Sequence, residues 1–131
     1  METLVGLQDL FEVYGDDYST PDGTCIRDYI HVSDLANAHL KAFEYLTREE
    51  NSIALNFGTG RGYSVMDVIK MTESVSGRKL NYKIGSRRLG DPAELYADAS
   101  QAKELLGWVP QLSDLESIIQ TTWAVYQDLV L

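Results

Sequence analysis

The sequence predicts an α/β fold with a small sheet of three to four short strands and about four helices. Short segments rich in Tyr, Ile and Val alternate with longer segments whose apolar residues recur at helical spacing, and clusters of Gly, Pro, Asp and Ser separate them. At 131 residues the chain fits one domain, residues 1–131. We expect a sheet this small to be incomplete by itself.

The first half of the chain predicts a loop, two strands and a helix. Residues 15–24 combine Gly, Asp, Ser, Thr and Pro without apolar periodicity, which indicates a loop. Residues 27–32 (RDYIHV) predict a strand, Ser33 is the expected N-cap of the next helix, and residues 52–57 (SIALNF) predict a second strand. The apolar face expected on that helix consists of Leu35, Ala38, His39, Ala42, Phe43 and Leu46.

A glycine-rich turn at residues 58–62 leads into a second helix. Ser64 and Asp67 have the spacing of a capping box, and Gly77 is the expected C-terminal stop. The apolar residues at helical spacing are Val65, Val68, Ile69 and Thr72.

The last third predicts one strand and two helices. Residues 80–84 (LNYKI) predict the strand, and residues 99–106 a short helix capped by Asp98 or Ser100. The final helix is expected to start at Ser113, which with Glu116 completes an S-x-x-E capping box. Its expected buried residues are Leu115, Ile118, Ile119, Thr122, Trp123 and Tyr126.

Composition excludes several classes of partner. Acidic residues outnumber basic ones 20 to 11, so we expect no nucleic-acid or anionic-membrane partner, although a small anionic ligand needs only a local basic patch. The single cysteine, Cys25, allows no internal disulfide and is expected to be a small buried or turn residue. Without an apolar segment of about 20 residues or a leader pattern, the chain is expected to be cytoplasmic.

Motifs for metal, cofactor or acid/base chemistry are weak. His31 and His39 have no further ligands at metal spacing, and His31 is expected to be a structural histidine. Gly58, Gly60 and Gly62 give G-x-G-x-G rather than the dinucleotide pattern G-x-G-x-x-G, so an ordinary tight turn is favoured over NAD binding. We predict no metal and no catalytic group in this chain.

Basic residues concentrate between Arg78 and Arg88. A solvated basic surface is one interpretation. The other is a nucleotide clamp, because a guanidinium binds phosphate oxygens through two hydrogen bonds and the carboxylate of Asp91 could accept hydrogen bonds from ribose. Arg27, after the 15–24 loop, could face the same anion.

Three blocks in order carry a resemblance: VYGDDYSTPDGTCIRDYIHVSDLANAH, NFGTGRGYSVMDVI and RRLGDPAELYADASQAKELLGW. Together they resemble the C-terminal part of the UDP-glucose 4-epimerase family, which belongs to the extended short-chain dehydrogenases/reductases. The resemblance covers about residues 6–128. It implies an α/β fold that lacks most of its Rossmann domain, and a nucleotide-sugar-binding role.

The resemblance also implies site residues. Arg88 and Asp91 are similar to the residues that hold the UDP pyrophosphate and ribose, with Arg27 as the second phosphate arginine. The implied wall around the uridine consists of Tyr14, Tyr29 and Val65. Leu95 falls where the family places a residue that sets the room around the sugar; the alternative is that it packs under its loop. Arg87 is expected to be structural or peripheral.

Groups for the epimerase chemistry are missing. The NAD loop is absent, and none of the eight tyrosines has Lys four positions later. We therefore expect this chain to bind the UDP part of a UDP-hexose but to bind no cofactor and to be inactive alone, with NAD and the interconversion of UDP-glucose and UDP-galactose belonging to the full-length parent. The alternatives are an inactive binding or interaction module, or the equivalent part of a sister epimerase or dehydratase.

Apolar helix faces suggest one further partner. If the NAD-binding part normally covers the helices predicted at residues 34–46 and 65–76, the isolated chain is expected to self-associate through them.

Overall fold

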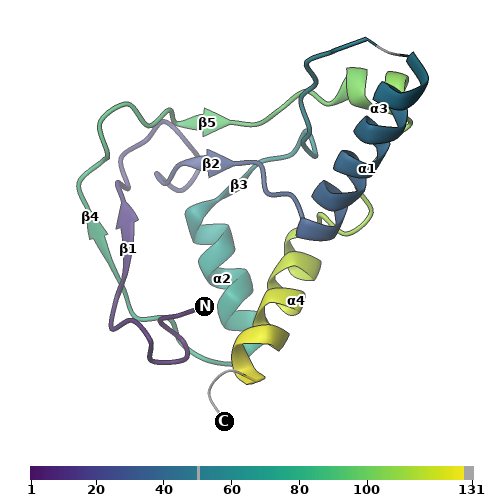
Figure 1. The fold of residues 1–131 in the computed structure, drawn as a ribbon. Helices are drawn as coiled ribbons and strands as arrows, with labels where there is room; N and C mark the ends of the chain where they lie inside the picture. Colours follow the sequence, from purple (N-terminus) through teal and green to yellow (C-terminus); the bar gives the residue numbers. More distant parts are fainter. Residues whose placement is uncertain (50, 129–131) are drawn as a thin grey trace.

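Two small sheets and four helices make up residues 1–49 and 51–128, the part of the chain that the computed structural model describes (Figure 1). The predicted α/β class is confirmed. One sheet pairs β1 (Phe11–Tyr14) in parallel with β4 (Tyr82–Gly85). In the other, β2 (Ile26–Arg27) lies between β3 (Tyr63–Ser64), which is antiparallel to it, and β5 (Glu94–Leu95), which is parallel to it.

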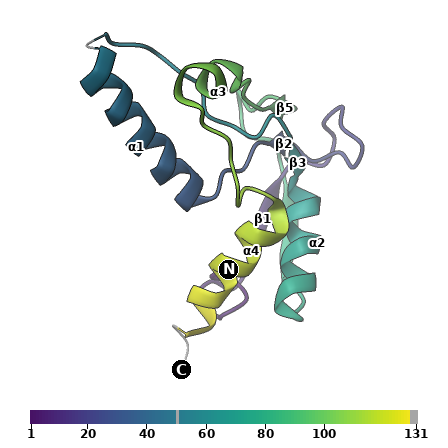
Figure 2. The same cartoon turned by 90° about the vertical axis from the view of Figure 1, so that its right-hand side faces the viewer.

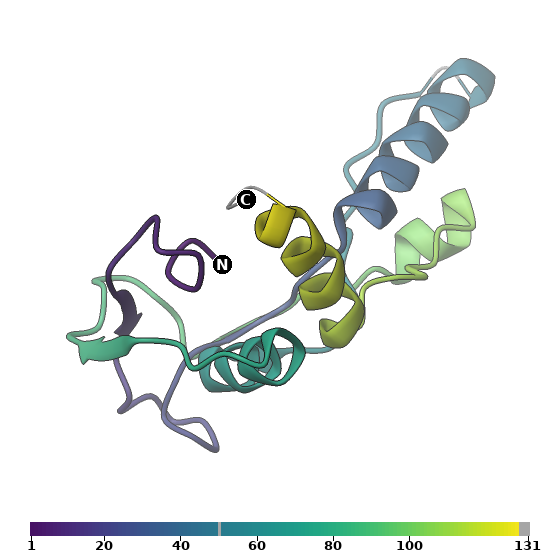
Figure 3. The same ribbon diagram turned by 90° about the horizontal axis from the view of Figure 1, so that it is seen from below.

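The helices form two pairs. Helix α2 (Val65–Ser76) packs against α4 (Leu115–Asp128), and α1 (Val32–Glu49) contacts the short α3 (Ser100–Leu106). Figure 2 shows α1 diverging from the α2 and α4 pair. Seen from below, β1 and β4 lie at one end of the molecule and α1 with α3 at the other, with α2 and α4 between them (Figure 3). Among the described residues, no helix combines the length and hydropathy of a membrane span.

A small core joins α1 to α3. Ala38, Ala102 and Trp108 are at most 1% exposed, and the Phe57 ring meets the Trp108 ring edge-on at a centroid distance of 5.1 Å. The Trp108 indole Nε1 donates to the carbonyl oxygen of Asp34 at 3.1 Å, so the polar atom of this buried ring is satisfied.

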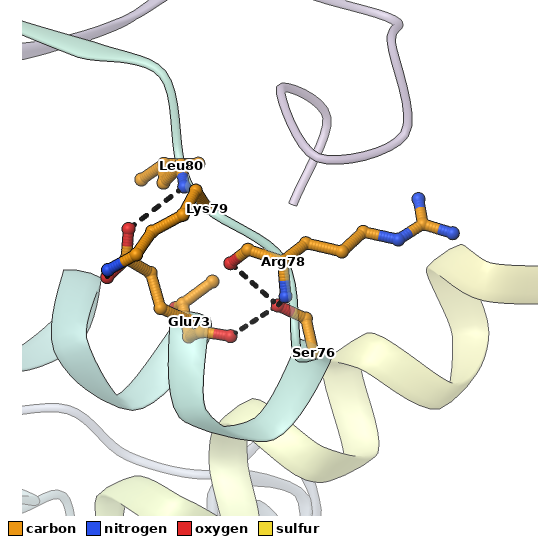
Figure 4. A network of polar contacts seen from close by, with 6 residues as sticks. Glu73, Ser76, Arg78, Lys79 and Leu80 are labelled. Atoms are coloured by element: carbon orange, nitrogen blue, oxygen red, sulfur yellow. Dashed lines mark hydrogen bonds and ion pairs between the residues drawn. The ribbon is translucent and has the colours of Figure 1, made fainter.

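Helix α2 confirms the prediction at both ends. Ser64 and Asp67 form the reciprocal capping box, and Gly77 closes the helix in the left-handed conformation, at φ 66°. Glu73, within α2, accepts hydrogen bonds from two residues that follow this glycine: the Leu80 backbone N–H and the Lys79 side chain. Figure 4 shows Arg78 extending from this network toward α4, where its guanidinium lies 5.2 Å from the Trp123 ring centroid.

The predicted strand over 27–32 is wrong in extent. Strand β2 ends at Arg27, and α1 begins at Val32, before the predicted cap Ser33. The cap is His31, whose Nδ1 accepts from the Ser33 N–H at 3.0 Å. Its Nε2 lies 2.9 Å from the Thr121 hydroxyl, so the expectation of a structural histidine is confirmed.

The predicted strand over 52–57 is also wrong. No strand of the described chain pairs with it, and most of its residues are exposed. A strand exists only through hydrogen bonds to a neighbour, so an apolar sequence by itself does not produce one. The face expected to be buried on α1 is likewise open: Ala38 is buried, whereas Leu35, Phe43 and Leu46 are exposed.

The start of α4 needs a correction. Ser113 does not cap this helix, because its hydroxyl donates to Asp34 at 2.6 Å and accepts from the His31 N–H. Asp114 provides the cap, accepting from the Ser117 N–H at 2.8 Å. Of the expected buried positions, Leu115 and Ile119 are buried and the others are half-buried. Strand β1 was not predicted, whereas α3 was. The predicted cap of α3 is wrong, because the N-cap position is Ala99; Asp98, one residue earlier, accepts from the Ser100 N–H at 2.9 Å.

Candidate functional site

Two arginines meet at one carboxylate near the edge of the three-stranded sheet. Arg27, at the end of β2, places Nη2 3.8 Å from Asp91 Oδ1, and Arg88 places Nε 2.9 Å from Asp91 Oδ2. Arg27 also donates from Nη1 to the Ile26 carbonyl at 2.7 Å. The structure therefore brings together the three residues that the sequence predicts as a clamp.

Neighbouring Arg87 and Arg88 lie on different aromatic rings. The Arg88 guanidinium lies 4.7 Å from the centroid of Tyr14, at the end of β1, whereas Arg87 lies 4.2 Å from the centroid of Tyr18. Arg87 also donates to the carboxylate of Asp17 at 2.5 Å. The structure thus ties Arg87 to the 15–24 loop and leaves Arg88 beside Asp91.

The 15–24 loop is held against the start of α2. Asp22 accepts hydrogen bonds from the Thr24 N–H at 3.0 Å, the Thr24 hydroxyl at 2.7 Å and the Ser64 hydroxyl at 2.5 Å. Burial opposes ionisation of Asp22, but these hydrogen bonds outweigh it and hold its pKa below the usual value. This ionised carboxylate fixes the loop that precedes β2 and Arg27.

The predicted uridine wall is dispersed around β2. Tyr29 follows β2, is half-buried, and has a pKa raised by burial. Val65 opens α2, and its N–H donates to the Cys25 carbonyl at 3.2 Å. Cys25 is buried, as expected. Of the three wall residues, only Tyr14 has a ring contact with the clamp among the described residues.

Leu95 borders a cavity of about 370 Å³ beside the clamp. It is 60% exposed and pairs in register with Arg27, so the alternative that it packs under its loop does not hold. The cavity is lined by Arg27, Asp28, Ile30, Asn56, Phe57, Leu95, Tyr96 and Ala97.

Sequence reasoning missed Asp28. Its carboxylate accepts from the Thr59 hydroxyl at 2.6 Å, from the Thr59 N–H at 2.9 Å and from the Ala97 N–H at 3.4 Å. The available signal was a carboxylate next to Arg27 together with a glycine-rich turn that offers free N–H groups. Neither signal says that the two segments meet.

Two of the three glycines in the glycine-rich turn pack closely against the chain itself, whereas a Cβ at Gly60 would meet nothing within 4 Å. A Cβ at Gly58 would lie 2.5 Å from the Asp28 carboxylate, and a Cβ at Gly62 would lie 2.2 Å from the Ile26 side chain. Gly58 and Gly62 therefore allow close packing within the protein.

A sequence model of the family described as GDP-mannose 4,6 dehydratase matches residues 1–122. The UDP-glucose 4-epimerase of Halalkalibacterium halodurans is 43% identical over 123 residues, which cover 94% of this chain and 37% of that protein. The chain therefore spans little more than a third of that relative's length.

Two crystal structures share the fold. The UDP-glucose 4-epimerase from Brucella ovis in complex with NAD gives a TM-score of 0.89 at 48% identity, covering 95% of this chain and 38% of that one. The enzyme from Bifidobacterium longum in complex with NAD⁺ and UDP gives 0.88 at 42% identity, covering 99% and 39%. The chain belongs to the family that the GDP-mannose 4,6 dehydratase model describes, and the relatives that it matches are UDP-glucose 4-epimerases of the extended short-chain dehydrogenase/reductase fold.

Proposed function

We propose that this chain binds the UDP part of a UDP-hexose through Arg27, Arg88 and Asp91, as part of a UDP-glucose 4-epimerase that interconverts UDP-glucose and UDP-galactose. The observation that carries the proposal is the convergence of two guanidinium groups on one carboxylate. Phosphate oxygens favour such paired guanidinium groups, and a carboxylate favours the ribose hydroxyls.

Arg88 of the clamp has hydrogen-bond donors that its described contacts do not use. A guanidinium has five N–H donors, and the contacts described for Arg88 use Nε on Asp91 and one face on Tyr14. Its two Nη groups are therefore available for a diphosphate. With its side chain 60% exposed against 21% for Arg27, Arg88 is the more accessible arginine. Asp91 orients both guanidinium groups before the ligand arrives.

The cavity beside Leu95 is the proposed hexose end. It starts at Arg27, so a ligand whose diphosphate lies on the clamp would extend its sugar toward Asn56, Phe57 and Tyr96. The Asn56 amide can donate to and accept from sugar hydroxyls, and the aromatic rings offer flat apolar faces. Tyr14, Tyr29 and Val65 are the proposed surroundings of the uridine.

Catalysis is not proposed for this chain alone. Its sequence has no Tyr-x-x-x-Lys pair, and its glycine-rich turn has the spacing G-x-G-x-G rather than the dinucleotide pattern G-x-G-x-x-G. We propose that NAD and hydride transfer belong to the full-length parent. Formation of UDP-galactose from UDP-glucose by the purified chain, above a heat-killed control, would contradict this.

Calorimetry with UDP tests the clamp. Arg88→Ala is expected to weaken UDP binding by about 1.5–3 kcal/mol, because it removes charge-assisted hydrogen bonds. The matched control is Arg61→Ala, which removes one exposed arginine outside the cavity. Equal UDP affinity for the wild type and Arg88→Ala would reject the assignment.

Self-association is a second proposal, favoured by the open face of α1. Phe43 is 65% exposed, with Leu35, Leu40 and Leu46 also exposed on the same helix. The sequence suggested α2 as well, but its Ile69 and Thr72 are buried, and α2 packs against α4. We therefore propose that two copies associate through α1.

A further inference from the structure

The Asp28 carboxylate joins three segments around the cavity that holds Leu95. It extends from the end of β2, next to Arg27, and both of its oxygens are engaged. Oδ1 accepts from the Thr59 hydroxyl at 2.6 Å, and Oδ2 accepts from the N–H groups of Thr59 at 2.9 Å and Ala97 at 3.4 Å. The Asp28 N–H also donates to the Leu95 carbonyl at 3.2 Å.

The glycine-rich turn approaches Asp28 and Ala97 so closely that position 58 requires glycine. A Cβ at Gly58 would lie 2.5 Å from Asp28 Oδ2 and 2.7 Å from the Ala97 Cβ. No side chain fits between these groups without displacing them, so the turn lies directly on the carboxylate.

This contact matters because the cavity wall before the turn lacks a strand partner. Residues 52–57 have no ladder hydrogen bonds within the described chain, yet Asn56 and Phe57 line the cavity. Side-chain contacts at its end help to hold this wall: the Phe57 ring lies on Trp108, and Thr59, two residues later, donates to Asp28. Of these, the second ties the wall to β2, which carries Arg27.

We propose that Asp28 is a positioning residue for the hexose end of the site. Its two oxygens are occupied by Thr59 and Ala97, so it acts through the segments that it holds. It sets the distance between the Asn56 and Phe57 wall and the Leu95 wall, whereas Arg88 and Asp91 of the clamp are held by their contact with each other. This inference rests on the proposed binding of a UDP-hexose.

The test compares two ligands by calorimetry: UDP, which lacks the hexose, and UDP-glucose. In the wild type the glucose is expected to increase affinity. Asp28→Asn turns one acceptor into a donor that faces the Thr59 or Ala97 N–H, and it is expected to weaken UDP-glucose binding about tenfold while changing UDP binding by less than about twofold. Asp98→Asn is the control of equal charge change, because that carboxylate accepts from its neighbour Ser100.

A second pair of variants covers the case in which Asp28→Asn does not fold. Thr59→Val removes the hydroxyl that donates to Asp28 and is expected to reproduce the loss, whereas Thr59→Ser keeps the hydroxyl and is expected to restore UDP-glucose affinity.

Parallel loss of UDP and UDP-glucose affinity would reduce Asp28 to a general structural role and overturn the inference. So would a wild type in which glucose adds nothing to the affinity of UDP. In both of these results UDP still binds to the wild type, so the proposed function stands. If the wild type binds neither ligand, the proposed function and this inference fail together.

Discussion

The end of the molecule that carries the clamp differs from the end that carries α1 in whether its surface side chains have partners within the chain. Around β1, β4 and β5, charged groups meet partners on the same chain: Arg88 meets Asp91, and Arg87 meets Asp17. Along α1, the apolar side chains of Phe43 and Leu46 remain 65% and 46% exposed. Polar groups need partners in specific directions, whereas apolar surface can be covered by any well-fitting face. The clamp is thus organised by contacts within its own chain, whereas α1 leaves apolar surface exposed.

The largest predicted effect comes from cutting the link between α1 and the segment that precedes α4. Asp34, on α1, accepts from the N–H groups of Gln111 and Leu112 and from the Ser113 hydroxyl, all within 3.0 Å. Asp34→Ala leaves these donors unpaired beside a buried site, and it should lower the free energy of unfolding by about 3 kcal/mol. Urea denaturation measures it.

The control for that loss is Asp98→Ala. Asp98 is exposed and accepts from the Ser100 N–H, so its removal should lower the free energy of unfolding much less than Asp34→Ala does. Equal losses in the two variants would mean that Asp34 does not hold α1 to the segment before α4.

The open face of α1 gives the next effect. Phe43→Glu places a charge on the surface proposed to join two copies and should weaken self-association by about 2 kcal/mol, the contribution of one buried Phe side chain. Sedimentation over a range of concentrations measures it. Leu89→Glu is the control, since Leu89 is fully exposed in the clamp loop. A wild type that stays monomeric at high concentration would remove the proposal.

Low pH should destabilise the protein through the hydrogen-bonded carboxylate of Asp34. Burial opposes ionisation of Asp34, but hydrogen bonds from Ser113, Gln111 and Leu112 outweigh it and hold the pKa below the usual 3.8. A lowered pKa in the folded state means that the stability is fully present above pH 3.8 and is lost as the pH falls below it. The urea concentration at the midpoint of unfolding should therefore decrease as the pH is lowered below about 4. This decrease should be less steep in Asp34→Asn. Equal slopes in the two proteins would argue against this origin.

What the sequence could predict depended on how far each signal reaches. The α2 helix was predicted with both ends because its capping box and Gly77 act within a few residues. The start of α4 was not, because the hydroxyl expected to cap it is taken by Asp34, 79 positions away. The strand expected at 52–57 failed for the related reason that a strand requires a partner.

The same limit applies to the site. Residue types and family resemblance named Arg27, Arg88 and Asp91, and the structure brings these three together. Asp28 was missed because its role comes from contacts with Thr59 and Ala97, and nothing near it in the sequence signals that these segments meet.

The smallest predicted effect concerns sugar choice at Leu95. The family resemblance implies that a tyrosine here narrows the pocket to UDP-glucose and UDP-galactose, while a small residue leaves room for a 2-N-acetyl group. Leucine is intermediate in size, and its exposed side chain lines the cavity. A full-length enzyme carrying this segment should therefore turn over UDP-N-acetylglucosamine, and Leu95→Tyr should suppress that reaction more than the UDP-galactose reaction.

Steric exclusion is the physical reason for that expectation. The tyrosine ring would occupy the space of the acetyl group and leave the smaller hexose its room, which changes the ratio of the two kcat/KM values by about tenfold. Leu112→Tyr is the control, because Leu112 is also partly exposed but lies outside the cavity. If Leu95→Tyr leaves the ratio unchanged, the acetyl group does not lie beside Leu95, and the sugar must point toward the Asn56 side of the cavity instead.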